Sequence, residues 1–351
     1  MSAVKEARIE RHVTITKVLF VLILLLGIGL QLAGAIQKSY WGDEAYTAIV
    51  TQGKPENMEE YNQVRHPLYY YMMSYWGRLF GFDELGLRSS SIIFALLTLM
   101  LTYLLSRDLS NDKAALISIF ILGLSPLFVQ HAHDARYYAL MSCLAVLVAL
   151  SVNRYINTGK FWYLTLYSFA GALMLYMAFT CIVFIVGCNI WWLGVRIRER
   201  KLVLTDLVYW GFANILILLI FIPALNRLNF FVTYNLQTAL VSNWSVELIK
   251  RLVYSAYAFS LGGTLSPLNP IVWIGIEAVL LIGGYAIFSA NRSRGIWLPV
   301  FFSLWSGIFG TLISFFSSFH NLIWQNLTHW FFYILPFLSI WLGMGLVRMK
   351  K

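Results

Sequence analysis

Long apolar blocks alternate with short polar segments along most of the chain. An α-helix rises about 1.5 Å per residue, so a block of about 20 apolar residues spans the ~30 Å hydrocarbon core of a bilayer. The pattern predicts an all-α integral membrane protein, a polytopic bundle of about ten transmembrane helices. We place the spans at residues 15–36, 87–105, 114–129, 137–152, 161–178, 179–195, 202–221, 271–290, 296–316 and 330–347.

The stretch from Phe161 to Val195 is predicted to form two helices rather than one. It contains no charged residue, and Lys160 and Arg196 flank it. A single helix of this length would reach about 52 Å, too long for one hydrocarbon core of ~30 Å. Two short helices that turn near "YMAFT" leave both basic residues on the same side of the membrane. The number of spans is then even, which predicts both chain termini on one side.

Two segments between the spans, residues 37–86 and 223–270, are long and rich in aromatic residues. The piece "HPLYYYMMSYWGRLFGF" in the first of them has few charges. Tyr and Trp prefer the membrane–water interface, so this composition predicts helices that lie in the interface. The chain shows no internal repeat. It is therefore predicted to be one domain over residues 1–351, with two long extracytoplasmic loops and no separate soluble domain.

Composition and charge agree with a membrane protein. The chain is 59% hydrophobic and 12% charged, whereas soluble domains are about 45–50% apolar and about 25% charged. The net charge of +10 does not indicate nucleic-acid binding, because most Lys and Arg residues fall in short loops and termini on one predicted side. This is the positive-inside pattern, and it places both termini in the cytoplasm. Block 15–36 is longer than the apolar core of a signal peptide, so we expect it to be retained.

All three cysteines, Cys143, Cys181 and Cys188, fall inside predicted spans. With no cysteine pair in an exposed loop, the sequence supports neither a disulfide framework nor a zinc knuckle. Buried small hydrophobic side chains are the expected role of these residues.

Two adjacent carboxylates, Asp43 and Glu44, follow the first span in the stretch "YWGDEAYT". Charged residues are scarce in this chain, so a pair at the mouth of a membrane helix is a candidate catalytic site. The piece "GDEAYTAIV" also begins like a helix, where Asp is a favoured N-cap residue, and capping alone is the alternative explanation. Adjacent carboxylates can take different roles, one facing substrate and the other held by hydrogen bonds.

The third and fourth predicted spans are short and enclose the loop "QHAHDAR". Helices of about 16 residues reach about 24 Å, so this loop is expected to dip below the outer surface. Charge at that depth persists where it lines a wet cavity or is buried in protein. We therefore expect His131, His133, Asp134 and Arg136 in an outward-facing cavity near Asp43. The His-x-His-Asp run could bind a metal, but alone it is a weak signal, and we predict no metal or other cofactor.

Three basic residues on the outer side are candidates for phosphate binding. Arg65 and His66 precede Pro67, which fixes the backbone and gives both groups a defined direction. Arg136, followed by Tyr137, stands at the start of the fourth span, where the helix dipole and a guanidinium both favour a phosphate. For all three residues, contact with lipid headgroups is the alternative.

A carboxylate, several cations and aromatic surfaces are thus expected together on one side of the membrane. This set suits the displacement of a phosphate leaving group from a substrate that a lipid tail anchors. The carboxylate would take the proton of an attacking hydroxyl, and the cations would stabilise the developing phosphate charge. The aromatic loops would contact sugars and an isoprenoid chain.

In its first half the chain resembles a family of membrane enzymes. The pieces "DEAYTA", "HPLYYYMMSYWGRLFG", "LGLRSSSIIFALLT" and "LSPLFVQHAHDARYYAL" follow one another between Ser39 and Leu150. Their order and spacing are similar to those of the GT-C-type polyprenyl-phosphate-sugar glycosyltransferases. This group contains the protein O-mannosyltransferases (glycosyltransferase family 39) and the bacterial aminoarabinose transferases. The resemblance implies a GT-C fold and an inverting sugar transfer from a polyprenyl phosphate, without a metal.

The resemblance also implies roles for residues. The Asp of the family's Asp-Glu pair is the general base, which places that role on Asp43. We expect Glu44 to be catalytic as well, by orienting Asp43 or the acceptor. Arg88 opens the second span as a family Arg does, the family's basic residue before "PPL" corresponds to Arg65 or His66, and His329 in "HWFFYILP" stands where the family often has Arg-Tyr. The predicted residues that bind the donor phosphate and substrate are Arg65, His66, Arg88, His133, Asp134, Arg136, Tyr137 and His329.

Two other classes of function remain open from the sequence. A transporter or flippase for a lipid-linked or anionic solute would more often show an internal repeat and charges near the bilayer midplane, where only Glu277 is expected. A non-catalytic membrane subunit would keep its function after Asp43→Asn. The predicted partners are a lipid-linked sugar donor, membrane lipids and an acceptor protein, lipid or glycan, with no nucleic acid. The sugar and the acceptor stay open.

Overall fold

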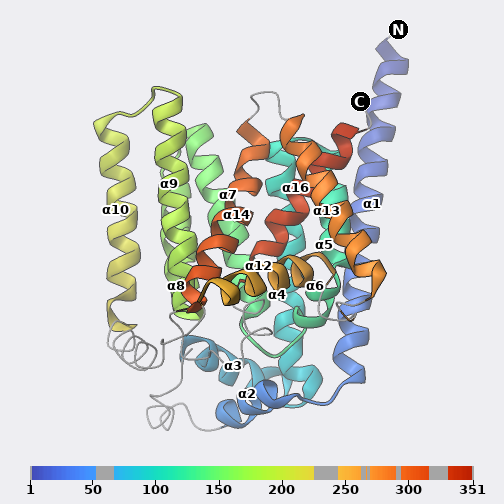
Figure 1. The fold of residues 1–351 in the computed structure, drawn as a ribbon, viewed down its shortest axis with the longest axis vertical. Coiled ribbons are helices and arrows are strands. Elements are labelled where there is room, and N and C mark those ends of the chain that lie inside the picture. Colours follow the sequence, from blue (N-terminus) through green and yellow to red (C-terminus); the bar gives the residue numbers. More distant parts are fainter. Residues whose placement is uncertain are drawn as a thin grey trace.

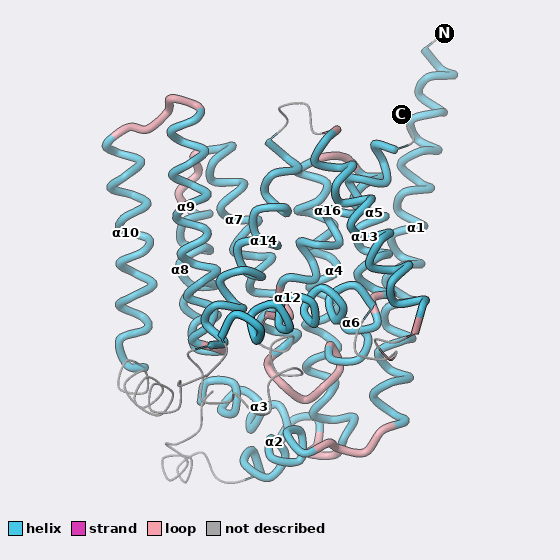
Figure 2. Tube along the Cα trace, in the orientation of Figure 1, coloured by secondary structure: helices cyan, strands magenta, loops and turns pink. Residues whose placement is uncertain are grey.

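The computed structural model describes residues 2–52, 67–224, 244–261, 266, 269–289, 294–315 and 331–349. Within these ranges every regular element is helical (Figure 2), which confirms the predicted all-α class. The α-helices are α1 (Ser2–Gln37), α2 (Gly42–Gln52), α3 (Pro67–Phe80), α4 (Glu84–Leu109), α5 (Asp112–Leu124), α6 (Pro126–His131), α7 (Tyr138–Thr158), α8 (Trp162–Met177), α9 (Ile182–Arg198), α10 (Leu204–Phe221), α12 (Trp244–Leu261), α13 (Pro270–Phe288), α14 (Arg294–Phe315) and α16 (Ile334–Met349).

The long helices run side by side as a bundle, and both chain termini lie at the same end of it (Figure 1). Helices α2 and α3 lie at the opposite end, and α12 crosses the front of the bundle. In the interior, α16 packs against α5, and α4 packs against both α5 and α7. The short helices of the first long loop therefore cover one end of the bundle, which is the end that carries the candidate site.

Six helices are long and apolar enough to cross a membrane, which confirms a multi-pass architecture. They comprise Thr14–Gln37, Glu84–Leu109, Tyr138–Thr158, Phe179–Arg198, Leu204–Ala224 and Pro270–Phe288. A helix lies in each of the ten ranges that the sequence predicts as spans. Within the described residues, six of these ranges hold helices that meet both the length and the hydropathy needed to cross a membrane, so the number of about ten spans stays a prediction.

The predicted span 114–129 is interrupted by a proline. Helix α5 ends at Leu124, and α6 begins at Pro126, the first position of a new helix. A residue before proline is driven away from the α conformation, and Ser125 accordingly has φ −59° and ψ 121°. Its N–H donates to the Leu122 carbonyl at 3.1 Å. The expected single helix is therefore a helix of 13 residues followed by one of 6.

Local sequence signals set several other helix boundaries. The side chains of Asp83 and Asn111 each accept a hydrogen bond at 2.9 Å from the N–H three residues on, and so cap α4 and α5. Helix α7 ends before Gly159, whose φ of 68° lies in the left-handed region that glycine adopts at a helix C-terminus. The predicted turn near "YMAFT" is confirmed, because α8 ends at Met177 and α9 begins at Ile182.

Helix α7 is the most enclosed of the six candidate spans. In its apolar part 89% of the residues are buried, compared with 17% in α1 and in α13. The outward faces of α1 and α13 therefore suit contact with lipid, whereas α7 belongs to the protein interior. The loop residues 131–135, which precede α7, are buried as well.

Candidate active site

The first turn of α2 separates the two adjacent carboxylates. The helix begins at Gly42, and the N–H groups of Glu44 and Ala45 both donate to the Trp41 carbonyl at 2.9 Å. Glu44 reaches back, and its Oε2 accepts from the Trp41 N–H at 3.4 Å, as in a capping box. Asp43 occupies the second helical position with its side chain half exposed. Trp41, and not Asp43, therefore takes the N-cap place.

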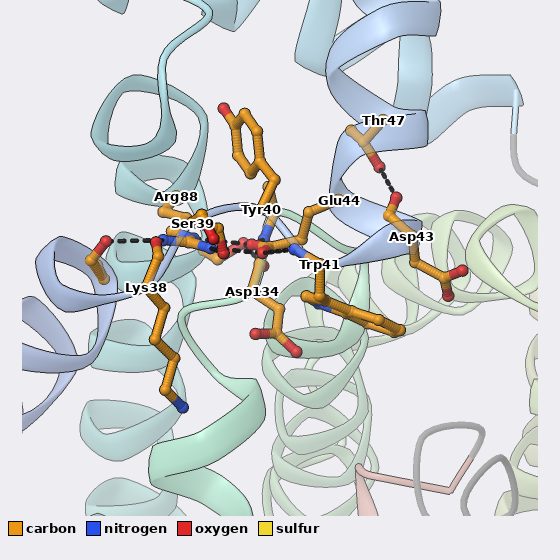
Figure 3. A network of polar contacts seen from close by, with 12 residues as sticks. Lys38, Ser39, Tyr40, Trp41, Asp43, Glu44, Thr47, Arg88 and Asp134 are labelled. Carbon is orange, nitrogen blue, oxygen red and sulfur yellow. Dashed lines mark hydrogen bonds and ion pairs between the residues drawn. The ribbon is translucent and has the colours of Figure 1, made fainter.

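Glu44 lies at the centre of a buried polar network (Figure 3). Arg88, near the start of α4, donates from Nε to Glu44 Oε1 at 2.8 Å and from Nη2 to Oε2 at 2.5 Å. The same guanidinium donates to the carbonyls of Ala35, Lys38 and Ser39 at the end of α1, at 2.7, 2.5 and 3.1 Å. Arg88 and Glu44 are only 1% and 0% exposed. A bidentate ion pair out of contact with water thus joins α1, α2 and α4.

The same carboxylate also holds the loop between α6 and α7. The Ala135 N–H donates to Glu44 Oε1 at 2.7 Å, and the Ser91 hydroxyl on α4 donates to the Asp134 carbonyl at 2.6 Å. The sequence predicts that the loop "QHAHDAR" lies near Asp43 and Glu44. In the structure this loop is hydrogen-bonded directly to Glu44.

Asp43 faces Arg136 at the end of this loop. Arg136 Nη2 lies 3.5 Å from Asp43 Oδ2. Its Nη1 donates to the Asp43 carbonyl at 3.4 Å and to the Tyr70 hydroxyl at 3.0 Å. The Arg136 side chain is 11% exposed and that of Asp43 is 50% exposed. The carboxylate is therefore the open side of the pair, and the guanidinium is the enclosed side.

Tyrosine rings surround the guanidinium of Arg136. It lies 5.7 Å from the ring centroid of Tyr137, and Tyr69 packs edge to face on both Tyr70 and Tyr137. Burial raises the pKa of Tyr70, and the charge of Arg136 partly offsets this. Sequence reasoning did not single out Tyr69 and Tyr70. The run "YYY" signals them, but which ring turns toward Arg136 depends on the phase of α3.

His131, His133 and Asp134 find partners inside the protein. His131 Nδ1 lies 2.8 Å from Asp134 Oδ2, and His133 Nδ1 lies 3.1 Å from Gln31 Oε1 on α1. Burial lowers the pKa of His133, and Asp134 opposes that shift. These contacts hold the loop between α6 and α7 in place. Among the described residues, no group of three or more His, Cys, Asp or Glu side chains is arranged to hold a metal ion.

The predicted site residues thus separate into distinct groups. Asp43, Arg136 and Tyr137 come together at one place, and Arg88 lies behind Glu44 instead of beside them. His133 and Asp134 bond to Gln31 and His131, as described above. Three further predicted residues lie outside the described part of the chain: Arg65, His66 and His329.

An apolar cavity of about 170 Å³ lies between α5, α6, α12, α13 and α16. Its lining includes Pro126, Phe259 and Leu335. Helix α6 begins at Pro126, which lines the cavity, and ends at His131, where the loop before Arg136 begins. The length of α6, roughly 8 Å, therefore separates the cavity from this loop.

Comparison with known proteins places this geometry in a fold family. Residues 64–226 match the family model of dolichyl-phosphate-mannose-protein mannosyltransferase, a range that includes Arg88 and Arg136 and begins after Asp43. ArnT from Cupriavidus metallidurans, solved with undecaprenyl phosphate, superimposes with a TM-score of 0.64 at 14% identity. The alignment covers 93% of this chain and 60% of ArnT. The chain has the GT-C fold. The resemblance to GT-C-type polyprenyl-phosphate-sugar glycosyltransferases is confirmed.

Other proteins also match this chain over part of their length. The oligosaccharyltransferase AglB of Archaeoglobus fulgidus, solved with an inhibitory peptide and a dolichol phosphate, gives a TM-score of 0.54 at 14% identity, over 95% of this chain and 50% of AglB. An uncharacterized protein of Aquifex aeolicus is 40% identical over 70 residues, which are 20% of this chain and 14% of that protein. The chain therefore spans 60% or less of the length of these relatives.

Proposed function

We propose that this GT-C chain is a membrane glycosyltransferase that moves a sugar from a polyprenyl phosphate to an acceptor hydroxyl, with Asp43 as the general base. The observation that carries the proposal is the pair of Asp43 and Arg136. An open carboxylate stands 3.5 Å from an enclosed guanidinium among tyrosine rings. The matches to a mannosyltransferase family model and to ArnT support the same reaction class.

The proposed reaction is a single displacement at the anomeric carbon of the sugar. The acceptor oxygen attacks that carbon, Asp43 takes the hydroxyl proton, and the bond from carbon to the phosphate oxygen breaks. The products are the glycoside, with inverted configuration, and a free polyprenyl phosphate. Arg136 holds the phosphate charge as the bond breaks, and Tyr70 and Tyr137 form the walls beside it.

The donor-binding set differs from the one that the sequence suggests. Arg136 and Tyr137 stay in it. Five others remain predictions: Arg65, His66, His133, Asp134 and His329. Arg88 and Glu44 are too enclosed to touch donor or acceptor, at 1% and 0% exposure, so we assign neither of them a direct chemical role. The apolar cavity beside α6 has the character needed for isoprenoid units of the donor tail.

The site is proposed to face away from the cytoplasm. The opposite end of the bundle carries Arg107, Arg196 and Arg198 in last turns of helices, the basic excess typical of the cytoplasmic side. A cysteine at exposed Ile49 should react with a membrane-impermeant maleimide on intact cells, and one at Lys201 only after permeabilisation. The native cysteines are buried and provide the background. The reverse labelling pattern would contradict this orientation.

The catalytic proposal is tested with purified protein and a panel of polyprenyl-phosphate sugars, with transfer or release followed by mass spectrometry. Asp43→Asn should lower turnover by about 10²- to 10⁴-fold, the usual contribution of a general base. Asp108→Asn removes a carboxylate paired with Arg154 at the far end of α4 and serves as the matched control. Equal loss in both variants, or none in Asp43→Asn, would contradict the assignment. Absence of turnover with every donor, in protein that unfolds cooperatively, would contradict the enzyme class and favour a transporter.

A further inference from the structure

We propose that α4 acts as a template that sets the separation of Asp43 and Arg136, with Glu44, Arg88 and Ser91 as positioning residues. The effect on rate rests on the proposed function, whereas the structural tie can be measured without it.

Glu44 has no capacity left for proton transfer. A carboxylate offers about four lone-pair positions, and four donors reach this one. Two come from Arg88, one is the Ala135 N–H and one is the Trp41 N–H. The group is fully buried. Glu44 therefore works as a connector between three segments of chain.

Arg88 is saturated in the same way. A guanidinium has five N–H donors, and the structure shows five hydrogen bonds from Arg88, two to Glu44 and three to carbonyls at the end of α1. A phosphate could bind Arg88 only in place of one of these bonds. The residue that sequence analysis assigns to the donor therefore belongs to the framework.

Ser91, one helical turn after Arg88, makes a second connection between α4 and the loop before α7. Its hydroxyl donates to the Asp134 carbonyl, while Glu44, held by Arg88, accepts from the next residue, Ala135. Asp43 directly precedes Glu44, and Arg136 directly follows Ala135. The two groups of the reaction are thus each one residue away from a segment that α4 holds, although they are 93 residues apart in the chain.

This arrangement matters because displacement needs the base and the phosphate-binding cation at a defined separation. A displacement of about 1 Å in a reacting group can cost about 100-fold in rate, and precise sites depend on supporting hydrogen bonds to rigid elements. Helix α4 is such an element, since it packs against both α5 and α7.

A comparison of Ser91→Ala with Ser90→Ala is the most direct test of the proposed role of α4. The two serines are neighbours on α4, 2% and 1% exposed, and Ser90 bonds to the Leu87 carbonyl and Met73 instead of the loop. Ser91→Ala should speed amide hydrogen exchange in the peptide that contains Ala135 and lower kcat about fivefold, the value of about 1 kcal/mol for one hydrogen bond. Ser90→Ala should change neither. Equal behaviour of the two variants would overturn the proposal.

Glu44→Gln gives the second test, through the shape of the pH–rate profile. Asp43→Asn should abolish the acid limb that the base produces. Glu44→Gln should keep the limb at the same pH while the plateau falls about 100-fold, and in the Asp43→Asn background it should add little. Loss of the limb in Glu44→Gln, or a full additional loss in the double variant, would overturn the positioning role.

The two proposals fail in different ways. If wild-type protein transfers no sugar, the proposed function fails, and the exchange experiment still decides the structural tie. If transfer depends on Asp43 but Ser91→Ala matches Ser90→Ala in exchange and rate, the template fails and the enzyme assignment stands.

Discussion

The two ends of α4 each carry an ion pair between an arginine and a carboxylate, in opposite surroundings. At the site end Arg88 and Glu44 are 1% and 0% exposed and share further hydrogen bonds with α1 and the loop before α7. At the other end Asp108 accepts from Arg154 Nε on α7 at 2.7 Å, with the two side chains 22% and 27% exposed. The pairing is chemically similar, but only the first pair organises other parts of the chain.

Burial and the number of partners account for the difference. An exposed pair contributes about 0–1 kcal/mol, because water screens it and both side chains lose freedom. Breaking a buried pair leaves an uncompensated charge away from water and costs about 3–5 kcal/mol. The buried pair therefore ties the site together, whereas the exposed pair only joins two helices that already pack on each other.

The largest expected effect is that of Arg88→Ala. The change leaves the Glu44 carboxylate and three carbonyls without their donor, so the free energy of unfolding should fall by about 3–5 kcal/mol. Unfolding of detergent-purified protein, followed by tryptophan fluorescence, measures it. Arg88→Lys should recover only part of the loss, since an ammonium lacks the fork geometry. A loss below about 1 kcal/mol would place this pair in the same class as the exposed one.

The next effect is that of Gly34→Ala on α1, beside the site. A Cβ there would lie 2.5 Å from Cε1 of the His133 ring, so the ring and the loop must move. Overpacking of this kind costs about 1–3 kcal/mol. Gly29→Ala on the same helix meets nothing within 4 Å and should be neutral or slightly stabilising. Equal thermal stability of the two variants would show that the loop moves aside without lowering the free energy of unfolding.

A smaller effect is expected from acid. Burial lowers the pKa of His133, Lys38 and Arg88 lower it further, and Asp134 opposes them. The unfolded chain then binds a proton at this histidine more readily than the folded one. The stabilisation is complete above the ordinary pKa of about 6.5 and is lost as the pH falls below it, by at most about 1.4 kcal/mol per pH unit. His133→Gln should flatten the slope of stability between about pH 7 and 5, and an unchanged slope would exclude His133 as its source.

The smallest effect is that of Arg154→Ala at the far end of α4. Water reaches both members of this pair, so the free energy of unfolding should fall by no more than about 1 kcal/mol. Arg154 pairs with Asp108 at the end of α4 opposite the candidate site, so sugar transfer should stay within about twofold of wild type. A twofold change in rate corresponds to roughly 0.4 kcal/mol. A loss of stability as large as that of Arg88→Ala would mean that burial is not what distinguishes the two ends.

Local physical rules were enough for most of the helical framework. Apolar length predicted helices in ten ranges, and the run from Phe161 to Val195 had to break because it exceeds one bilayer. The break at Ser125 was readable as well, since Pro126 stands in the sequence, but apolar continuity across 114–129 concealed it. The sequence carried two conflicting signals at this point, the proline and the apolar run, and the prediction followed the apolar run.

The sequence by itself determined the membrane class, most of the helix ranges and the presence of carboxylates near a basic, histidine-containing loop, because hydropathy, length and turn chemistry are local properties. Only the tertiary structure decided that Asp43 faces Arg136 while Glu44 turns inward to Arg88. Neighbouring residues on a helix point about 100° apart, so the phase of α2 against α4 selects which carboxylate is open. That phase comes from contacts between segments far apart in the chain, which no local pattern contains.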